Sequence, residues 1–336
     1  MRHRVGFIET GFTILELLVA VVITLVLAGL MLTVVTNTLH LWRRTQDSFT
    51  MAAQAALALD LIERDLQAAI FRRNGQTWMA IEVTNSPASL DLRGWLIAAL
   101  MKPGTIESQR LIPNLAEGIH PLVDDARFGL SGAWLRFVTT NVESNGSVPI
   151  AVSYQIARRP VSGAVLANNP ADVRYTLYRS AIGATATFST GTDVTNSGYN
   201  STSANSAASR NPKTMMNPNS ADALATNVVD FGLWLYFRDT VSGDLRRIFP
   251  ADNDDTTHNA NGTGVVADPN RFPEVADVMV RILSDQGATS ISAMENGSGT
   301  LIRPAQYASD AEWWWGVVET HSQVYVRRMV VAGGPL

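Results

Sequence analysis

The chain begins with an apolar run that contains a single charged side chain. From Phe12 to Val35 the only charged residue is Glu16. A helix of about 24 residues, rising about 1.5 Å per residue, is roughly 36 Å long and crosses the roughly 30 Å hydrocarbon layer of a membrane. A secretory signal peptide has a shorter apolar core with small residues after it, whereas here the small residue, Gly11, precedes the run. The sequence therefore predicts a transmembrane helix over 12–35.

Positive charge precedes this run. Arg2, His3 and Arg4 lie before it, and Glu9 is the one acidic residue of the segment 1–11. Positively charged flanks of a membrane helix stay on the cytoplasmic side. We therefore expect residues 1–11 in the cytoplasm and the bulk of the chain outside it.

Glu16 is unusual within the run, because an ionisable side chain in hydrocarbon costs a few kcal/mol and is by default a functional-site hypothesis. The run offers no basic side chain to pair with it. Cleavage after Gly11 would create a cation, the new amino terminus of Phe12, about one helical turn from Glu16. Within one chain this geometry is poor, but the amine of one subunit could meet the carboxylate of an axially staggered neighbour.

Residues 11–21, Gly-Phe-Thr-Ile-Leu-Glu-Leu-Leu-Val-Ala-Val, resemble the processing and methylation motif of type IV pilins and type II secretion pseudopilins. The resemblance implies that a prepilin peptidase removes the leader 1–11 by cutting between Gly11 and Phe12. It also implies that Phe12 is N-methylated and that Glu16 pairs with a neighbour's amino terminus during assembly. The expected location is a bacterial inner membrane, with one span, a periplasmic domain and other pilin-like subunits as partners. A plain signal anchor with an incidental Gly and Glu is the alternative.

Charge and cysteine content exclude several classes of site. The formal net charge is −4 and the isoelectric point is about 5.7, which argues against a nucleic-acid-binding surface. The chain contains no cysteine, so disulfides, thiolate catalysis and cysteine-based metal sites are excluded. An exported domain of this chain must therefore depend on its packed core.

Apolar residues continue at helical spacing beyond the membrane segment. They recur every three, four or seven residues at Leu39, Trp42, Phe49, Ala52, Ala56, Leu59, Ile62, Leu66 and Ile70, and no proline precedes Pro87. One helix over 12–72 is therefore predicted, ended by Asn74-Gly75. The charged residues within 61–67 are interpreted as a solvated face of this helix.

The remainder, 73–336, predicts an extracytoplasmic, mainly antiparallel β-rich domain, and hence an α+β fold with the long helix packed on it. Alternating or β-branched segments predict strands at 134–139, 150–156, 173–179, 233–238, 245–249 and 275–283. Asn145-Gly146 predicts a hairpin turn between the first two. A helix around 313–315 and a strand over 325–331 are expected at the end. Polar segments near 183–219 and 252–270 predict flexible insertions.

The order of these segments resembles the minor pseudopilin J subunits of type II secretion systems. The resemblance rests on the Ile62-Glu63-Arg64-Asp65-Leu66-Gln67 helix end, the strand pair that follows, and the later segments 173–179, 228–239 and 272–282. It implies a structural minor or tip subunit of a pseudopilus. The chain is longer than a typical J subunit because of its insertions, so a large W-like minor pilin of a type IV pilus is the alternative.

The domain carries no recognisable catalytic or cofactor motif. Its histidines lack the i, i+4 spacing of a zinc-binding helix, and no His-Glu-x-x-His motif occurs. We therefore expect no enzyme activity and no cofactor. Asp252, Asp254 and Asp255 are a weak calcium candidate, because the loop lacks the alternating acidic spacing and the distal Glu of an EF-hand. A membrane-tethered enzyme or binding protein with a pilin-type anchor is the competing class.

Trp313, Trp314 and Trp315 are three adjacent indoles that cannot all face one core. Aromatic residues are enriched at interaction surfaces, which makes the triplet a candidate partner interface. The alternative is an internal wedge between a helix and a sheet.

Overall fold

The computed structural model describes residues 13–93, 95, 102–103, 110–115, 118–143, 146–160, 173–200, 215–262, 270–295 and 302–331. The chain divides into two compact units, residues 1–50 and 51–336. The leader 1–11 and Phe12 lie outside the described residues.

The helix α1 spans Ile14–Gln67, which confirms the predicted long helix. It is long and apolar enough to cross a membrane, by length and composition alone. The predicted end at residue 72 is wrong, because the chain leaves the helix after Gln67. There Ala69 forms a bridge with Thr139 and the Ile70 N–H donates to the Val138 carbonyl, so the backbone groups after Gln67 bond to a strand instead of continuing the helix.

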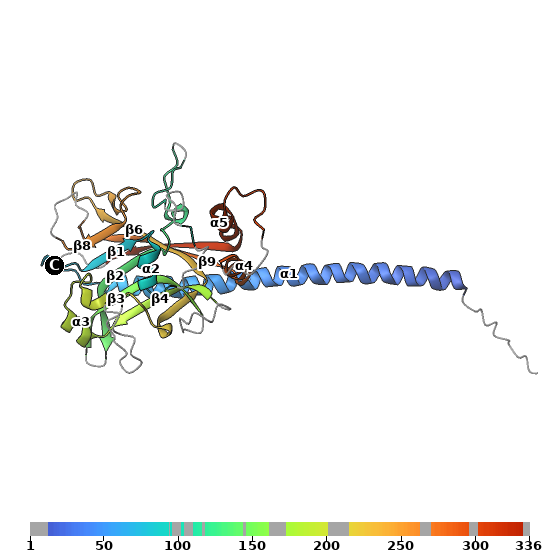
Figure 1. The fold of residues 1–336 in the computed structure, drawn as a ribbon, viewed down its shortest axis with the longest axis horizontal. Helices are drawn as coiled ribbons and strands as arrows, with labels where there is room; N and C mark the ends of the chain where they lie inside the picture. The colour runs from blue at the N-terminus through green and yellow to red at the C-terminus, as the bar shows by residue number, and fades with distance from the viewer. Residues whose placement is uncertain are drawn as a thin grey trace, which may run out of the picture. The chain divides into compact units, whose positions relative to one another are not determined.

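Two antiparallel sheets form the domain of the second unit (Figure 1), and the α+β class is confirmed. The six-stranded sheet A has the order β5-β4-β3-β2-β1-β8, and the four-stranded sheet B has the order β10-β9-β6-β7. Their strands are β1 Met79–Val83, β2 Ala133–Glu143, β3 Gly146–Pro160, β4 Val173–Ile182, β5 Ala223–Thr226, β6 Val228–Arg238, β7 Leu245–Phe249, β8 Thr257–Ala260, β9 Val275–Leu283 and β10 Ser322–Val330.

Four shorter helices accompany the sheets in the described residues: α2 Pro87–Leu92, α3 Ala184–Thr190, α4 Asp285–Glu295 and α5 Asp310–His321. Three short 3₁₀ turns are η1 Val123–Asp125, η2 Ser197–Asn200 and η4 Ser220–Asp222. The expected helix around 313–315 and the strand after it are confirmed as α5 and β10. The sequence did not predict α4, whose Gly287 and hydroxyl-bearing residues have low helix propensity. Its buried face, which includes Ile291 and Met294, packs on the core and stabilises it.

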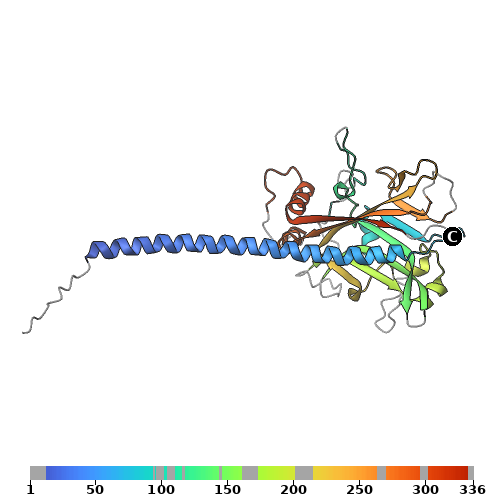
Figure 2. The ribbon, with the colours of Figure 1, turned by 180° about the vertical axis from the view of Figure 1, so that it is seen from behind.

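The main core joins both sheets to residues 51–66 of α1. Buried side chains of the helix recur every three or four positions, at Met51, Ala55, Ala58, Leu59, Ile62 and Leu66. They belong to one apolar cluster with side chains of β2, β6 and β9, such as Phe137, Phe231 and Val280. Figure 2 shows this part of α1 lying across the strands, with β10 beside it.

The predicted hairpin is confirmed. Strands β2 and β3 pair antiparallel from Leu135↔Tyr154 to Glu143↔Gly146. Asn145, expected in the turn, lies outside the described residues.

The described parts of the two predicted insertions are folded. In 183–219, Ala186 of α3, Tyr199 of η2 and the later residue Met215 form a second apolar cluster with Trp134 and Ala151 of sheet A. This segment therefore covers the face of sheet A opposite the main core, at least over its described residues. In 252–270, β8 pairs with β1 at the edge of the same sheet. Hydrogen bonds add to these contacts, such as the bond from the Ala151 N–H to Thr187 Oγ1.

Candidate functional site

The described part of the predicted processing motif begins with a capping box. Thr13 precedes the first helical residue, Ile14, and Glu16 is the third. The backbone N–H and the hydroxyl of Thr13 both donate to Glu16 Oε2, at 3.0 Å each, and the Glu16 N–H donates to Thr13 Oγ1 at 3.3 Å. This reciprocal arrangement satisfies N–H groups that a helix start leaves without intrahelical partners. The Thr-x-x-Glu spacing was a readable signal for it.

The Glu16 carboxylate thus has neutral donors in the isolated chain. No ion pair to Glu16 occurs among the described residues. Gly11 and Phe12, the predicted processing residues, lie outside them. The side chain of Glu16 is exposed, so its carboxylate is open to a cation from outside the chain.

The described part of the first unit has an exposed apolar surface. All large apolar side chains from Ile14 to Trp42 are exposed, for example Met31 at 72% and Trp42 at 63%. They occur on every side of the helix, not along one stripe. A helix that is apolar all round requires a membrane or other helices to cover it.

The three tryptophans of α5 have different environments. Trp314 and Trp315 are buried in the main core, whereas Trp313 is half-buried. The rings of Trp314 and Trp315 meet edge to face with centroids 5.1 Å apart. The prediction of a partner interface is therefore corrected for Trp314 and Trp315, which form the internal wedge. Of the three tryptophans, Trp313 alone has substantial exposed surface.

A buried carboxylate fixes this wedge. Glu295 of α4 accepts from the Trp314 indole N–H at 3.0 Å and from the Tyr175 hydroxyl at 2.5 Å, and it pairs with Arg158 at 2.5 Å. Burial raises the pKa of Glu295, while Arg158 and the two neutral donors oppose that shift. The group holds α4 and α5 to β3 and β4.

A second buried ion pair joins Lys102 to Asp230 of β6. The Lys102 Nζ lies 2.8 Å from Asp230 Oδ1, and both side chains are fully buried. Burial lowers the pKa of Lys102, and Asp230 opposes the shift. Neither buried pair was predicted, because a single charged residue in a sequence does not reveal which distant residue will neutralise it.

Asp65 of α1 corrects the interpretation of 61–67 as a wholly solvated face. Its side chain is 5% exposed and pairs with Arg179 of β4 at 2.7 Å. Around it, Glu63 lies at the surface and bonds Arg327 of β10 at 3.0 Å. The segment therefore has one face that binds sheet A and another at the surface.

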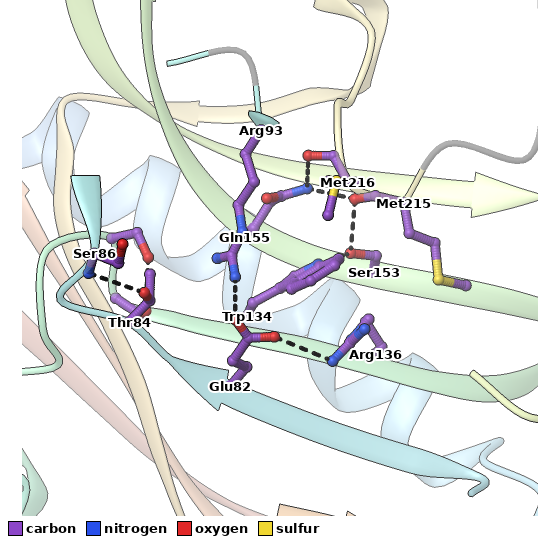
Figure 3. A network of polar contacts seen from close by, with 12 residues as sticks. Glu82, Thr84, Ser86, Arg93, Trp134, Arg136, Ser153, Gln155, Met215 and Met216 are labelled. Carbon is purple, nitrogen blue, oxygen red and sulfur yellow. Dashed lines mark hydrogen bonds and ion pairs between the residues drawn. The ribbon is translucent and has the colours of Figure 1, made fainter. Parts of the chain in front are cut away.

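Two buried arginines share one carboxylate on the covered face of sheet A (Figure 3). Arg93 follows α2 and bonds Glu82 of β1 through Nη2 and Oε1 at 2.7 Å, and Arg136 of β2 lies 3.6 Å from Glu82 Oε2. Both guanidiniums lie over the ring of Trp134, at 4.3 Å and 3.8 Å from its centroid. No sequence motif marks this group.

The calcium candidate Asp252, Asp254 and Asp255 makes local hydrogen bonds. Asp252 Oδ1 accepts from the Asp254 N–H at 2.9 Å, and Asp255 Oδ2 accepts from the Ala251 N–H at 2.8 Å. Within the part of the chain that the structure describes, no group of three or more His, Asp or Glu residues is arranged to hold a metal ion.

No family model, no curated protein and no solved structure matches the chain. The layout itself, a long apolar N-terminal helix on a β-rich domain, fits that of a pilin-like protein.

Proposed function

We propose that the protein is a structural, pilin-like minor subunit that a prepilin peptidase processes between Gly11 and Phe12. The observation that carries the proposal is the start of α1. The segment 14–42 of α1 is exposed and apolar all round, begins two residues after Phe12, and carries its one carboxylate, Glu16, in the first turn. Processing there would leave the new amine on Phe12, two residues before the first residue of the helix.

The capping box suggests how Glu16 changes partner. In the isolated chain its carboxylate binds the neutral donors of Thr13. An ammonium donor adds a Coulomb attraction that a neutral hydroxyl or amide lacks, and this attraction is stronger in a low-dielectric surrounding than in water. In an apolar surrounding, the amine of a neighbour's Phe12 therefore competes well with Thr13, which favours assembly of adjacent helices.

The first experiment tests processing. Gly11→Ala is expected to leave a full-length precursor when the chain is expressed with a prepilin peptidase. The matched control is Gly6→Ala, because Gly6 also precedes a phenylalanine but lacks the Glu at the required distance. Intact mass after membrane extraction measures the outcome. Normal maturation of Gly11→Ala, or a block by Gly6→Ala, contradicts the proposed site.

The second experiment separates assembly from helix capping. Glu16→Gln keeps a side chain that can accept the Thr13 bonds but removes the charge. Thr13→Val removes the hydroxyl but keeps the carboxylate. If the charge of Glu16 serves assembly, Glu16→Gln impairs incorporation into filaments and Thr13→Val impairs it much less. Equal defects in both variants would instead assign Glu16 to capping alone.

The finer proposal is a J-like tip or minor subunit of a type II secretion pseudopilus, with prepilin peptidase and other pilin-like subunits as partners. The order of the strands along the chain supports it. Because the chain has no cysteine, Trp313→Cys introduces a single thiol on α5 for cross-linking. Cross-linked products with pseudopilins, and not with type IV pilins, are expected when both sets are co-expressed. The reverse pattern favours the W-like minor pilin.

A further inference from the structure

The covered face of sheet A carries a positive charge that its own carboxylate does not balance. Glu82 and Trp134 are cross-strand neighbours, as are Arg136 and Ser153, so all four side chains lie on one face. Arg93 lies in the turn directly after α2, and Figure 3 shows its side chain pointing toward Glu82. Two guanidiniums therefore meet one carboxylate.

These guanidiniums are nearly removed from water. The side chains of Arg93 and Arg136 are 2% and 7% exposed, while that of Glu82 is 33% exposed. Buried charges are normally paired. Burial lowers the pKa of both arginines; for Arg136, burial and the positive charge of Arg93 together lower the pKa to about 10, although Glu82 opposes the shift. At neutral pH both stay charged, so the group has a net charge of about +1.

One further acid contributes weakly. The negative charge of Asp193 favours the charged form of Arg136, but it is the smallest of the influences on that group. The Asp193 Oδ1 atom accepts from the backbone N–H and the hydroxyl of Thr195. Asp193 therefore does not neutralise the pair of arginines at close range.

Several donors of the group have no acceptor in the protein. Within the described part of the chain, Arg93 Nε and Nη1 and Arg136 Nε are buried and have no hydrogen-bond partner. A buried donor without an acceptor loses its hydrogen bonds to water and gains none in return, and this costs more when the group is charged. The stacking of both guanidiniums on Trp134 holds them in place and offsets part of this cost.

We propose that Arg93 and Arg136 form a binding site for a small oxyanion of the phosphate or carboxylate type, entered from the partly exposed side of Glu82. An oxyanion supplies the missing negative charge and accepts the N–H groups that Glu82 leaves without a partner. Guanidinium groups are suited to such anions, because their donors are planar and keep their charge. The site lies on sheet A, independent of the N-terminal processing motif.

The test measures the thermal unfolding midpoint of the full chain in detergent micelles against added phosphate, sulfate or acetate, at ionic strength held constant with chloride. The wild type is expected to show a saturating rise with at least one oxyanion. Arg136→Gln should abolish that rise. Arg247→Gln is the matched control, because Arg247 also stacks on a tryptophan, Trp234, at 4.7 Å, but in sheet B; it should keep the rise.

A second variant keeps the test decisive if Arg136→Gln fails to fold. Glu82→Gln removes the competing carboxylate, so it should bind the same anion about tenfold more tightly or better, as a change of one charge close to the site requires. Isothermal titration with inorganic phosphate or acetate measures it. The proposal is overturned if neither wild type nor Glu82→Gln shows saturable binding, if Glu82→Gln binds no more tightly, or if the rise persists in a folded Arg136→Gln.

Discussion

The hydroxyl of Tyr154 on β3 donates to the carboxylate of Asp65 on α1 across 2.6 Å, in the buried space between helix and sheet. Arg179 of β4 binds the same carboxylate oxygen at 2.7 Å and the Tyr154 oxygen at 3.2 Å. Burial and the negative charge of Asp65 raise the pKa of Tyr154 well above its usual value. The three side chains tie the helix to sheet A through one closed set of bonds.

Asp65→Ala is expected to destabilise the domain by about 3–5 kcal/mol, because it leaves Arg179 and Tyr154 buried without their acceptor. Denaturant unfolding of the full chain in detergent measures the loss. Asp60→Ala on the same helix is the control. Asp60 bonds Arg327 at the surface, where an ion pair contributes about 0–1 kcal/mol. Equal losses in the two variants would contradict the assignment of Asp65 to the core.

His258 on β8 predicts a pH dependence of stability. Its imidazole is buried, and burial lowers its pKa to about 4, although the Nε2 contact with the Arg271 carbonyl opposes the shift. In the unfolded chain the imidazole has its ordinary pKa near 6.5, so the folded state binds a proton on His258 less readily than the unfolded state does. The contribution of neutral His258 to the free energy of unfolding is therefore fully present above pH ~6.5 and is lost as the pH falls through ~4.

The difference between a pKa near 6.5 in the unfolded chain and about 4 in the folded one corresponds to about 3 kcal/mol of unfolding free energy. Urea unfolding between pH 7 and pH 4 measures it as the difference between the wild type and His258→Gln. His120→Gln is the control, because His120 is exposed. A wild-type pH profile that parallels the His258→Gln profile would show that the imidazole is not buried in solution.

Gly232 of β6 is predicted to tolerate no side chain. A Cβ atom placed on it would overlap the ring of Phe128, which lies directly on the glycine. Gly232→Ala should therefore cost about 1–3 kcal/mol or more, as overpacking of a core does. Gly183→Ala is the control, since nothing lies within 4 Å of a Cβ there. In the double variant with Phe128→Leu, the Gly232→Ala cost should shrink, and additive costs would contradict direct contact.

The parts of this structure that follow from periodicity were predictable, and the parts that follow from distant pairing were not. The long helix, the β2–β3 hairpin and the strand β9 each have a local pattern of apolar residues or a turn signal. By contrast, Asp65 and Glu63 look alike in sequence, and only the positions of β4 and β10 decide that one is buried and the other is not. The composition of the segment 183–219 likewise did not show that Thr187 would accept a hydrogen bond from the Ala151 N–H of sheet A.

The candidate functional features also differ in whether the sequence alone reveals them. The processing motif is one continuous segment, 11–16, and the Thr13–Glu16 capping box lies within it. Both can therefore be recognised from the sequence alone. The group of Arg93, Glu82 and Arg136 comes from three separate segments, and its register depends on the pairing of Glu82 with Trp134. A chain without this pairing would place the two arginines apart, which is why no motif reveals them.

The tryptophan triplet of α5 supplies the last prediction. Trp314→Ala should cost about 3–5 kcal/mol of stability, because it removes a fully buried indole and leaves Glu295 with one donor fewer. Trp313→Ala should cost much less, since that ring is only half-buried. The unfolding free energy of each full-length variant tests the contrast. If Trp313 contributes to a partner surface, its alanine variant loses cross-linking to neighbouring subunits while its stability stays close to that of the wild type; a large loss of stability would place Trp313 in the core with the other two.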